Sequence, residues 1–320
     1  MPNAYLYSPH TAQALGARPR AARSHITFIA MISISNDFLT ATFSQKGAEL
    51  QSLRRTADGH EYLWHGDAAF WGGHSPILFP ATGRPWNETV RLADEAWHMP
   101  KHGLVRARQW QVEAAGSDEV TFVCTSTVAD FALFPFSWQL RVTYRLVDRT
   151  LQAHMAVTNT GGTTLWFQAG GHPAIATDPW NEADGCGGYI GLEGQAAYFR
   201  LVGEQGCWLP EEHAVPTDAD GLMPITPHTF DADALIFPEG QVQAVTVYNR
   251  ARRAVARVAS SAPVWLLWAP AGKCCPFVCA EPWYGLCDAV GFEGELPQRP
   301  YIQHAEAGET WHGGYEIACL

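Results

Sequence analysis

The sequence predicts an all-β protein, built as one large antiparallel β-sandwich. Three observations support this prediction. Apolar and polar residues alternate along many short stretches, which is the periodicity of half-buried strands. Turn residues separate these stretches at short intervals, as they do in hairpins. No stretch has the 3.6-residue period of a long amphipathic helix, which argues against a mixed α/β fold.

The clearest strands lie in the middle of the chain. Residues 138–146 alternate strictly, a turn at Asp148 and Arg149 follows, and residues 151–159 continue the pattern. The other predicted strands are residues 38–43, 48–53, 61–64, 110–113, 120–124, 245–248, 254–258, 264–268 and 315–317. Residues 65–100 are dense in Gly, Pro, His and Trp, so we expect a long irregular region of the kind that often contributes to function.

Residues 1–30 differ from the rest of the chain. They contain Arg18, Arg20 and Arg23 but no acidic residue, with Pro, Ala and Ser in between. The apolar run that follows is short for a secretory signal, and no small-residue cleavage site comes after it. We therefore predict a disordered N-terminal extension over residues 1–30, a single β-sandwich domain over residues 31–320, and a cytoplasmic location.

The composition excludes several classes of partner. A net charge of −11 and a pI near 5.6 argue against binding to nucleic acid or to anionic membranes. No apolar run approaches the length of a membrane span. The eight cysteines are expected to be buried free thiols, because the one cluster, Cys274-Cys275-(x3)-Cys279, fits no common zinc spacing. We predict no metal and no cofactor.

One carboxylate stands out among apolar neighbours. Glu281 lies in the stretch from Phe277 to Gly285, which follows an apolar run ending at Trp268. Pro282 disfavours helix at Glu281 and favours an extended conformation. Burial would raise the carboxyl pKa from about 4.3 toward neutrality, as a general base requires. The alternative is an exposed loop glutamate.

Two histidines beside glycines are candidates for acid–base chemistry. His102 precedes Gly103, and His172 lies between Gly171 and Pro173 at a predicted strand end. An imidazole with a pKa near 6.5 can donate or accept a proton at neutral pH. The alternative for each is an ordinary structural or exposed side chain, which is also what we expect for three further histidines, His74, His154 and His213.

Two more polar side chains are candidates for ligand binding. Arg84 lies in a Gly- and Pro-rich loop, where its guanidinium can direct two donors at neighbouring hydroxyls. Asp233 precedes the apolar run from Ala234 to Phe237, and Asp231 is its near neighbour. A surface-loop arginine and turn-forming aspartates are the structural alternatives.

Taken in order, these motifs resemble the aldose 1-epimerase (galactose mutarotase-like) family, in particular its LacX-like branch. The resemblance covers residues 32–319. The motifs are Gly47-Ala48-Glu49-Leu50, Glu61-Tyr62-Leu63-Trp64, Phe79-Pro80 with Gly83-Arg84, His102-Gly103, Gly171-His172-Pro173, Asp233-Ala234-Leu235-Ile236-Phe237 and Glu281-Pro282-Trp283.

The resemblance implies a galactose mutarotase-like supersandwich and cofactor-free interconversion of the α and β anomers of a hexose. Glu281 is expected to be the base on the C1 hydroxyl and His172 the acid on the ring oxygen. His102, Arg84 and Asp233 are expected to bind the sugar. The expected partner is a monosaccharide, and the protein is expected to be a monomer or a homodimer.

Three alternatives remain open at this point. A glycoside hydrolase could use Asp233 and Glu281 as its two carboxylates, although two histidines with a single glutamate count against it. Some relatives act on hexose 6-phosphates, and Arg106 and Arg108 are candidate phosphate ligands, although both also suit solvent-facing strand positions. The sequence departs from the family here, because Leu104 follows Gly103 where an aromatic residue is more common. A non-catalytic carbohydrate-binding or sensing protein is the third alternative.

Overall fold

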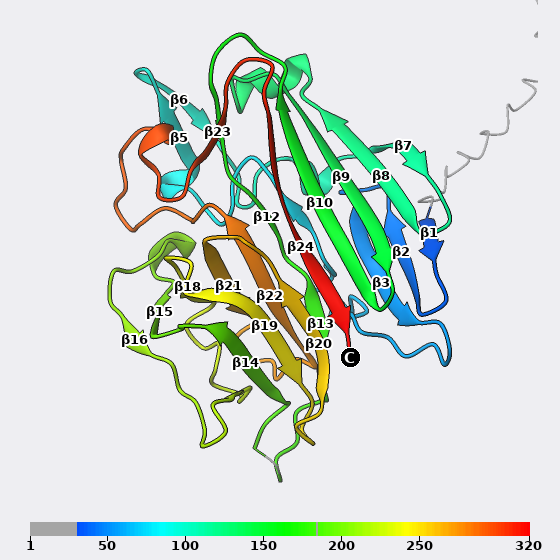
Figure 1. The fold of residues 1–320 in the computed structure, drawn as a ribbon. Coiled ribbons are helices and arrows are strands. Elements are labelled where there is room, and N and C mark those ends of the chain that lie inside the picture. The colour runs from blue at the N-terminus through cyan, green and yellow to red at the C-terminus, as the bar shows by residue number, and fades with distance from the viewer. Residues whose placement is uncertain (1–30, 184) are drawn as a thin grey trace, which may run out of the picture.

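The computed structural model describes residues 31–183 and 185–320, and this part of the chain is built almost entirely from β-strands (Figure 1). It contains twenty-four strands and five short 3-10 helices, and no α-helix occurs among the described residues. The all-β prediction is therefore confirmed. The described residues include no helix long and apolar enough to cross a membrane. The predicted N-terminal extension, residues 1–30, lies outside the described residues.

Two large sheets dominate the fold, and every pairing within them is antiparallel. The nine-stranded sheet has the order β17 (Met223–Pro224), β14 (Tyr189–Gly194), β19 (Val242–Tyr248), β20 (Ala254–Ala259), β24 (Thr310–Cys319), β10 (Thr150–Asn159), β9 (Trp138–Val147), β8 (Glu119–Thr125) and β7 (Gln111–Ala115). The eight-stranded sheet has the order β16 (His213–Ala214), β15 (Tyr198–Leu201), β18 (Leu235–Phe237), β21 (Val264–Trp268), β22 (Phe277–Tyr284), β12 (Ala169–Gly171) and β4 (Ile77–Leu78), with β13 (Ala174–Ala176) also paired to β22.

Smaller elements complete the structure. The three-stranded sheet contains β1 (Met31–Ser35), β2 (Leu39–Ser44) and β3 (Glu49–Arg55), and two strand pairs contain β5 (Thr89–Leu92) with β6 (Glu95–His98) and β11 (Leu165–Phe167) with β23 (Gln303–Ala305). The 3-10 helices are η1 (Trp86–Glu88), η2 (Val105–Ala107), η3 (Val128–Ala132), η4 (Glu204–Gly206) and η5 (Leu296–Gln298).

Strand alternation explains how the layers pack. Along β9 the odd–even pattern buries one set of side chains and leaves the other at least partly exposed. The buried Tyr144 packs against Phe43 of β2, and the buried Trp138 packs against Phe79, which follows β4. The inner face of the nine-stranded sheet thus contacts both the three-stranded sheet and the eight-stranded sheet, which makes the sandwich core.

Most predicted strands are present, with two differences. The predicted strand at residues 61–64 is wrong, because Glu61 and Leu63 make only isolated bridges, to Arg54 and Ile175. The region 65–100 contains the β5–β6 hairpin, which the sequence did not predict. Its turn residues, Ala93 and Asp94, both adopt positive φ, and neither is a glycine that would have marked the turn.

The β22 strand has a proline in its interior, where an N–H is normally needed. Ala280 donates its N–H to the carbonyl of Pro173, so Pro282, two residues later, faces the same neighbouring segment. That segment is itself interrupted, because β12 ends at Gly171 and β13 begins at Ala174. The two prolines therefore lie where the ladder is already broken, and the break exposes the side chain of His172 to a cavity.

A tight loop beside this break is shaped by backbone contacts. Gly103 has φ +73°, and an added Cβ would lie 2.2 Å from the carbonyl oxygen of Phe79. Leu104 donates its N–H to that same oxygen at 2.8 Å. The loop cannot move away from Phe79 without losing this hydrogen bond, so position 103 requires glycine.

We predict that Gly103→Ala lowers the free energy of unfolding by more than about 2 kcal/mol, from left-handed strain and the clash together. Gly59→Ala is the matched control, because Gly59 has the same φ of +73° but no atom within 4 Å of an added Cβ. It should cost only about 1 kcal/mol. Urea denaturation measures both, and equal losses would contradict this account of position 103.

Candidate active site

A cavity of about 220 Å³ opens at the interrupted ladder. Its walls include four of the five residues that the sequence analysis selected, namely His102, His172, Asp233 and Glu281. They come from four separate segments: the loop before η2, the gap between β12 and β13, the loop before β18, and the middle of β22. The fold therefore brings together residues that are up to 179 positions apart, from His102 to Glu281.

His172 and Glu281 lie directly across from each other. Gly170 pairs with Trp283 and Ala174 pairs with Cys279, and continuing either ladder places His172 opposite Glu281. Directly opposed residues project from the same face of a sheet. The His172 Nε2 atom lies 3.2 Å from the Glu281 Oε1 atom, and the two side chains are only 8% and 2% exposed.

Burial changes the proton affinity of both groups. It lowers the pKa of the His172 imidazole from 6.5 to about 3. Burial also raises the pKa of the Glu281 carboxyl well above its ordinary value, and the nearby Asp233 acts in the same direction while Lys101 opposes it. Both shifts disfavour charge, so the arrangement favours one proton held between the two side chains.

His102 is fixed as a hydrogen-bond donor toward the cavity. Its backbone N–H donates to the carbonyl of Gly83 at 2.7 Å, and the Gly83 N–H donates in return to His102 Nδ1 at 3.1 Å. An Nδ1 atom that accepts this bond cannot hold a proton, so the neutral ring has its proton on Nε2. Burial lowers the pKa of His102, with His172 contributing in the same direction, which keeps the ring neutral.

Asp233 and Arg84 are placed differently. The Asp233 carboxylate faces the cavity and has no hydrogen bond to another described residue. Arg84 is near the cavity, but its guanidinium is paired with Glu88 and its side chain does not line the wall. Its neighbour Gly83 does line the wall. A sugar-binding role for Arg84 stays a prediction, and it would require this ion pair to open.

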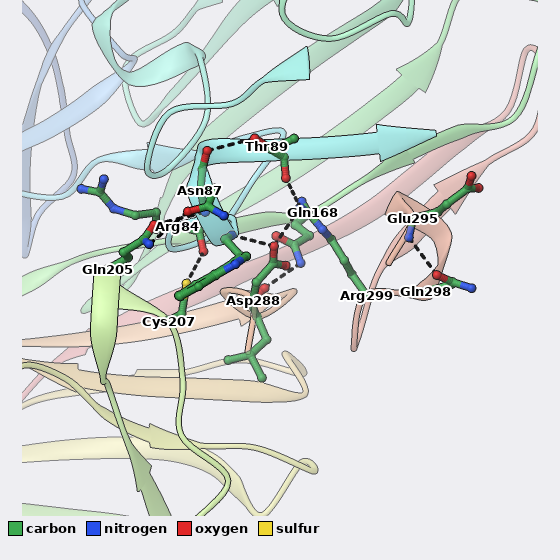
Figure 2. Close-up of polar contacts among 12 residues, drawn as sticks. Arg84, Asn87, Thr89, Gln168, Gln205, Cys207, Asp288, Glu295, Gln298 and Arg299 are labelled. Atoms are coloured by element: carbon green, nitrogen blue, oxygen red, sulfur yellow. Dashed lines mark hydrogen bonds and ion pairs between the residues drawn. The ribbon is translucent and has the colours of Figure 1, made fainter. Parts of the chain in front are cut away.

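Figure 2 shows the polar network behind this wall. Asp288 and Arg299 form an ion pair at 3.0 Å with both side chains 2% exposed. Asp288 also accepts the N–H of Trp86 at 2.8 Å, and Arg299 donates to the carbonyl of Thr89 at 3.1 Å. These bonds tie the loop around η1 to the segment that follows β22, so they hold Gly83 in position against the catalytic candidates.

A second pair of contacts in Figure 2 joins η1 to η4. Asn87 donates its backbone N–H to the Gln205 side chain at 3.2 Å, and the Gln205 amide donates to the Asn87 side chain at 3.0 Å. Asn87 and Gln205 both have positive φ. The next residue, Gly206, lines the cavity, so this reciprocal amide pair fixes another part of the wall.

Several wall residues were not identified from the sequence. Trp71 stacks on His172 with ring centroids 5.1 Å apart, and Trp268 meets the same ring edge-on at 5.6 Å. Trp71 belongs to the 65–100 region, whose unusual composition was the one available signal. Lys101 also lines the cavity and was not selected. Of the two candidate phosphate ligands, Arg106 lines the cavity, whereas Arg108 lies elsewhere and pairs with Asp130.

The buried side chains also include a possible metal-binding set. Donor atoms of His172, Cys279 and Glu281 lie within 4.8 Å of one another. An ion bound there would engage both members of the proton-sharing pair.

The comparisons with known proteins agree with this geometry. The family model for aldose 1-epimerase matches residues 30–317, so the chain belongs to the aldose 1-epimerase family. The chromosomal protein LacX of Lactococcus lactis subsp. lactis is 27% identical over 312 residues, which cover 90% of this chain and 99% of LacX. The resemblance inferred from the motifs is thereby confirmed.

Solved structures give the same result. A galactose mutarotase-like protein from Lactobacillus casei ATCC 334 superimposes with a TM-score of 0.84 at 27% identity, covering 91% of this chain and all of that one. A galactose mutarotase related enzyme from Lactobacillus acidophilus gives 0.82 at 25% identity, covering 91% and 97%. Family membership supports an isomerase-type enzyme that acts on a carbohydrate.

The depressed pKa of His172 predicts a specific acid sensitivity. The ring takes up a proton near pH 6.5 in the unfolded chain but only near pH 3 in the folded protein. Its contribution to stability is complete above pH 6.5 and is lost as the pH falls toward 3. Between these values the wild type should lose about 1.4 kcal/mol more per pH unit than His172→Gln.

Urea denaturation at a series of pH values measures this difference in slope. Comparing the two proteins removes the contributions of other titrating groups, including His102. Parallel pH profiles for the wild type and His172→Gln would show that the folded His172 ring titrates normally.

Proposed function

We propose that the protein is an aldose 1-epimerase that interconverts the α and β anomers of a free hexose. The observation that supports this most strongly is the buried pair of His172 and Glu281, with Nε2 and Oε1 only 3.2 Å apart at a cavity. Opening a cyclic hemiacetal requires a proton to leave O1 and another to reach O5. Both oxygens are bonded to C1 and lie close together, so an acid and a base that are adjacent in the protein can reach both of them.

In the proposed mechanism the shared proton first passes from Glu281 to His172 when the sugar binds. Glu281 then accepts the proton of the C1 hydroxyl while His172 donates its proton to the ring oxygen. The C1–O5 bond breaks and the open-chain aldehyde forms. Rotation about C1–C2 presents the other face of the aldehyde, and closure reverses both transfers. The pair contains one proton before and after each step, so no proton exchange with solvent is required.

The other cavity residues have supporting roles in this proposal. The Nε2–H of His102 donates a hydrogen bond to the sugar near the reacting oxygens, and the Asp233 carboxylate accepts bonds from sugar hydroxyls. Arg84 binds a hydroxyl if its pairing with Glu88 opens. Trp71 stacks on the His172 ring and Trp268 contacts it edge-on. These two contacts fix the orientation of the ring and so restrict the direction in which it donates a proton.

We predict that Glu281→Gln and His172→Gln each reduce the catalysed rate by about 10²- to 10⁴-fold, because each removes one proton-transfer group. Polarimetry of freshly dissolved α-D-glucose and α-D-galactose measures this rate. Glu95→Gln, on the exposed strand β6, is the control and should retain full activity. Sugar binding without any acceleration by the wild type would instead support the non-catalytic binding protein.

A phosphorylated hexose is a second candidate substrate. Lys101 and Arg106 line the cavity, and neither has a hydrogen bond or ion pair to another described residue. Most described arginines are ion-paired. Two unpaired cations beside a sugar site suit an anionic substituent such as a 6-phosphate.

For this candidate we predict that the double variant Lys101→Met, Arg106→Met raises KM for glucose 6-phosphate at least 10-fold. The KM for glucose should stay within about 2-fold, because a neutral sugar gains little from either cation. Anomerisation assays on both sugars measure the two constants. Equal changes for both sugars would favour the free hexose as substrate.

A further inference from the structure

A pair of histidines lies on the outer face of the nine-stranded sheet, away from the cavity described above. His154 of β10 and His312 of β24 are both exposed. His154 Nε2 lies 3.3 Å from His312 Nδ1, and the rings stack with centroids 5.1 Å apart. They line a second, open cavity of about 530 Å³ that shares no residue with the first. We propose that this pair, with Glu316, binds a divalent transition-metal ion such as Zn²⁺.

The strand register creates this grouping. His154 pairs with Gly314, so His312 and Glu316, each two residues from Gly314, are its two diagonal neighbours on the same face. Gly314 has no side chain to separate them. An added Cβ there would lie 2.2 Å from the carbonyl oxygen of Ala153, and φ is +156°. The backbone thus requires glycine at the centre of the group.

The nitrogen spacing suits coordination. Imidazole nitrogens bind zinc at about 2.0–2.1 Å, and two nitrogens 3.3 Å apart would then subtend about 105° at the metal, close to the tetrahedral angle. In the structure the two nitrogens form a hydrogen bond at this distance, and a bound ion would replace it. Imidazole nitrogens also bind copper and nickel, so the proposed site would accept several divalent transition-metal ions.

Glu316 is available as a third ligand. Its carboxylate is 3.8 Å from Arg257 Nη1, at the outer limit of an ion pair. Arg257 already binds Glu193 with bonds of 2.7 and 2.8 Å. The donor atoms of the two histidines and Glu316 do not all lie within 4.8 Å of one another, so Glu316 must leave Arg257 and change rotamer to bind the metal. Water molecules would complete the coordination shell of this exposed site.

A bound ion would link β10 to the C-terminal strand β24. Metal that binds the folded state alone raises thermal stability. This inference is independent of the proposed epimerase function, because neither histidine touches the first cavity. It also revises the expectation that His154 is an ordinary exposed side chain.

The test is isothermal titration of ZnCl₂ into the full, metal-stripped protein without an affinity tag, together with thermal melting. The wild type should bind one ion at this site and melt at a higher temperature with zinc. His154→Gln and His312→Gln should each weaken binding at least 10-fold and abolish the melting shift, and Glu316→Gln should weaken binding less. Polarimetric activity should not change in any of the three.

His228→Gln is the matched control, since His228 is also exposed and pairs with Asp231. It should bind zinc like the wild type. Unchanged zinc affinity in His154→Gln and His312→Gln would overturn the proposal. Zinc binding that is lost only in Cys279→Ser would also overturn it, because the ion would then occupy the first cavity.

Discussion

The fold of this protein places an imidazole and a carboxylate against each other inside a β-sheet, and the rest of the site depends on that contact. His172 occupies the gap between β12 and β13, and Glu281 lies opposite it on β22. Removing both side chains from water would be unfavourable if each of them were charged. It is much less unfavourable when the two side chains share one proton and neither is charged. Pro173 and Pro282 lie where the regular strand pairing is interrupted around His172 and Glu281.

The surrounding segments serve to keep this contact in one geometry. The Gly83 backbone fixes the tautomer of His102, and the buried pair of Asp288 and Arg299 anchors the loop that contains Gly83 (Figure 2). Trp71 reaches the site from an irregular loop and covers the His172 ring. The large sandwich supplies the rigid frame, while the loops at its edge supply the groups that meet the substrate.

The sequence predicted much of this and missed the rest for identifiable reasons. Strict alternation located β9 and β10, and a single carboxylate in an apolar stretch located Glu281. The spatial partners of Glu281 depend on strand register, which the sequence does not encode locally. Lys101 and Trp71 were missed because charged and aromatic loop residues are common on any surface. Arg84 was selected for its residue type, but its pairing with Glu88 depends on the fold of η1.

We infer that His172 stays neutral beside Glu281 and that the two side chains share a single proton. Nitrogen-15 NMR of histidine-labelled protein tests it directly, with the His172 signals assigned by their loss in His172→Gln. We expect a neutral His172 ring from pH 8 down to at least pH 5, with protonation only near pH 3. A ring that becomes fully protonated with an ordinary midpoint near 6.5 would contradict it.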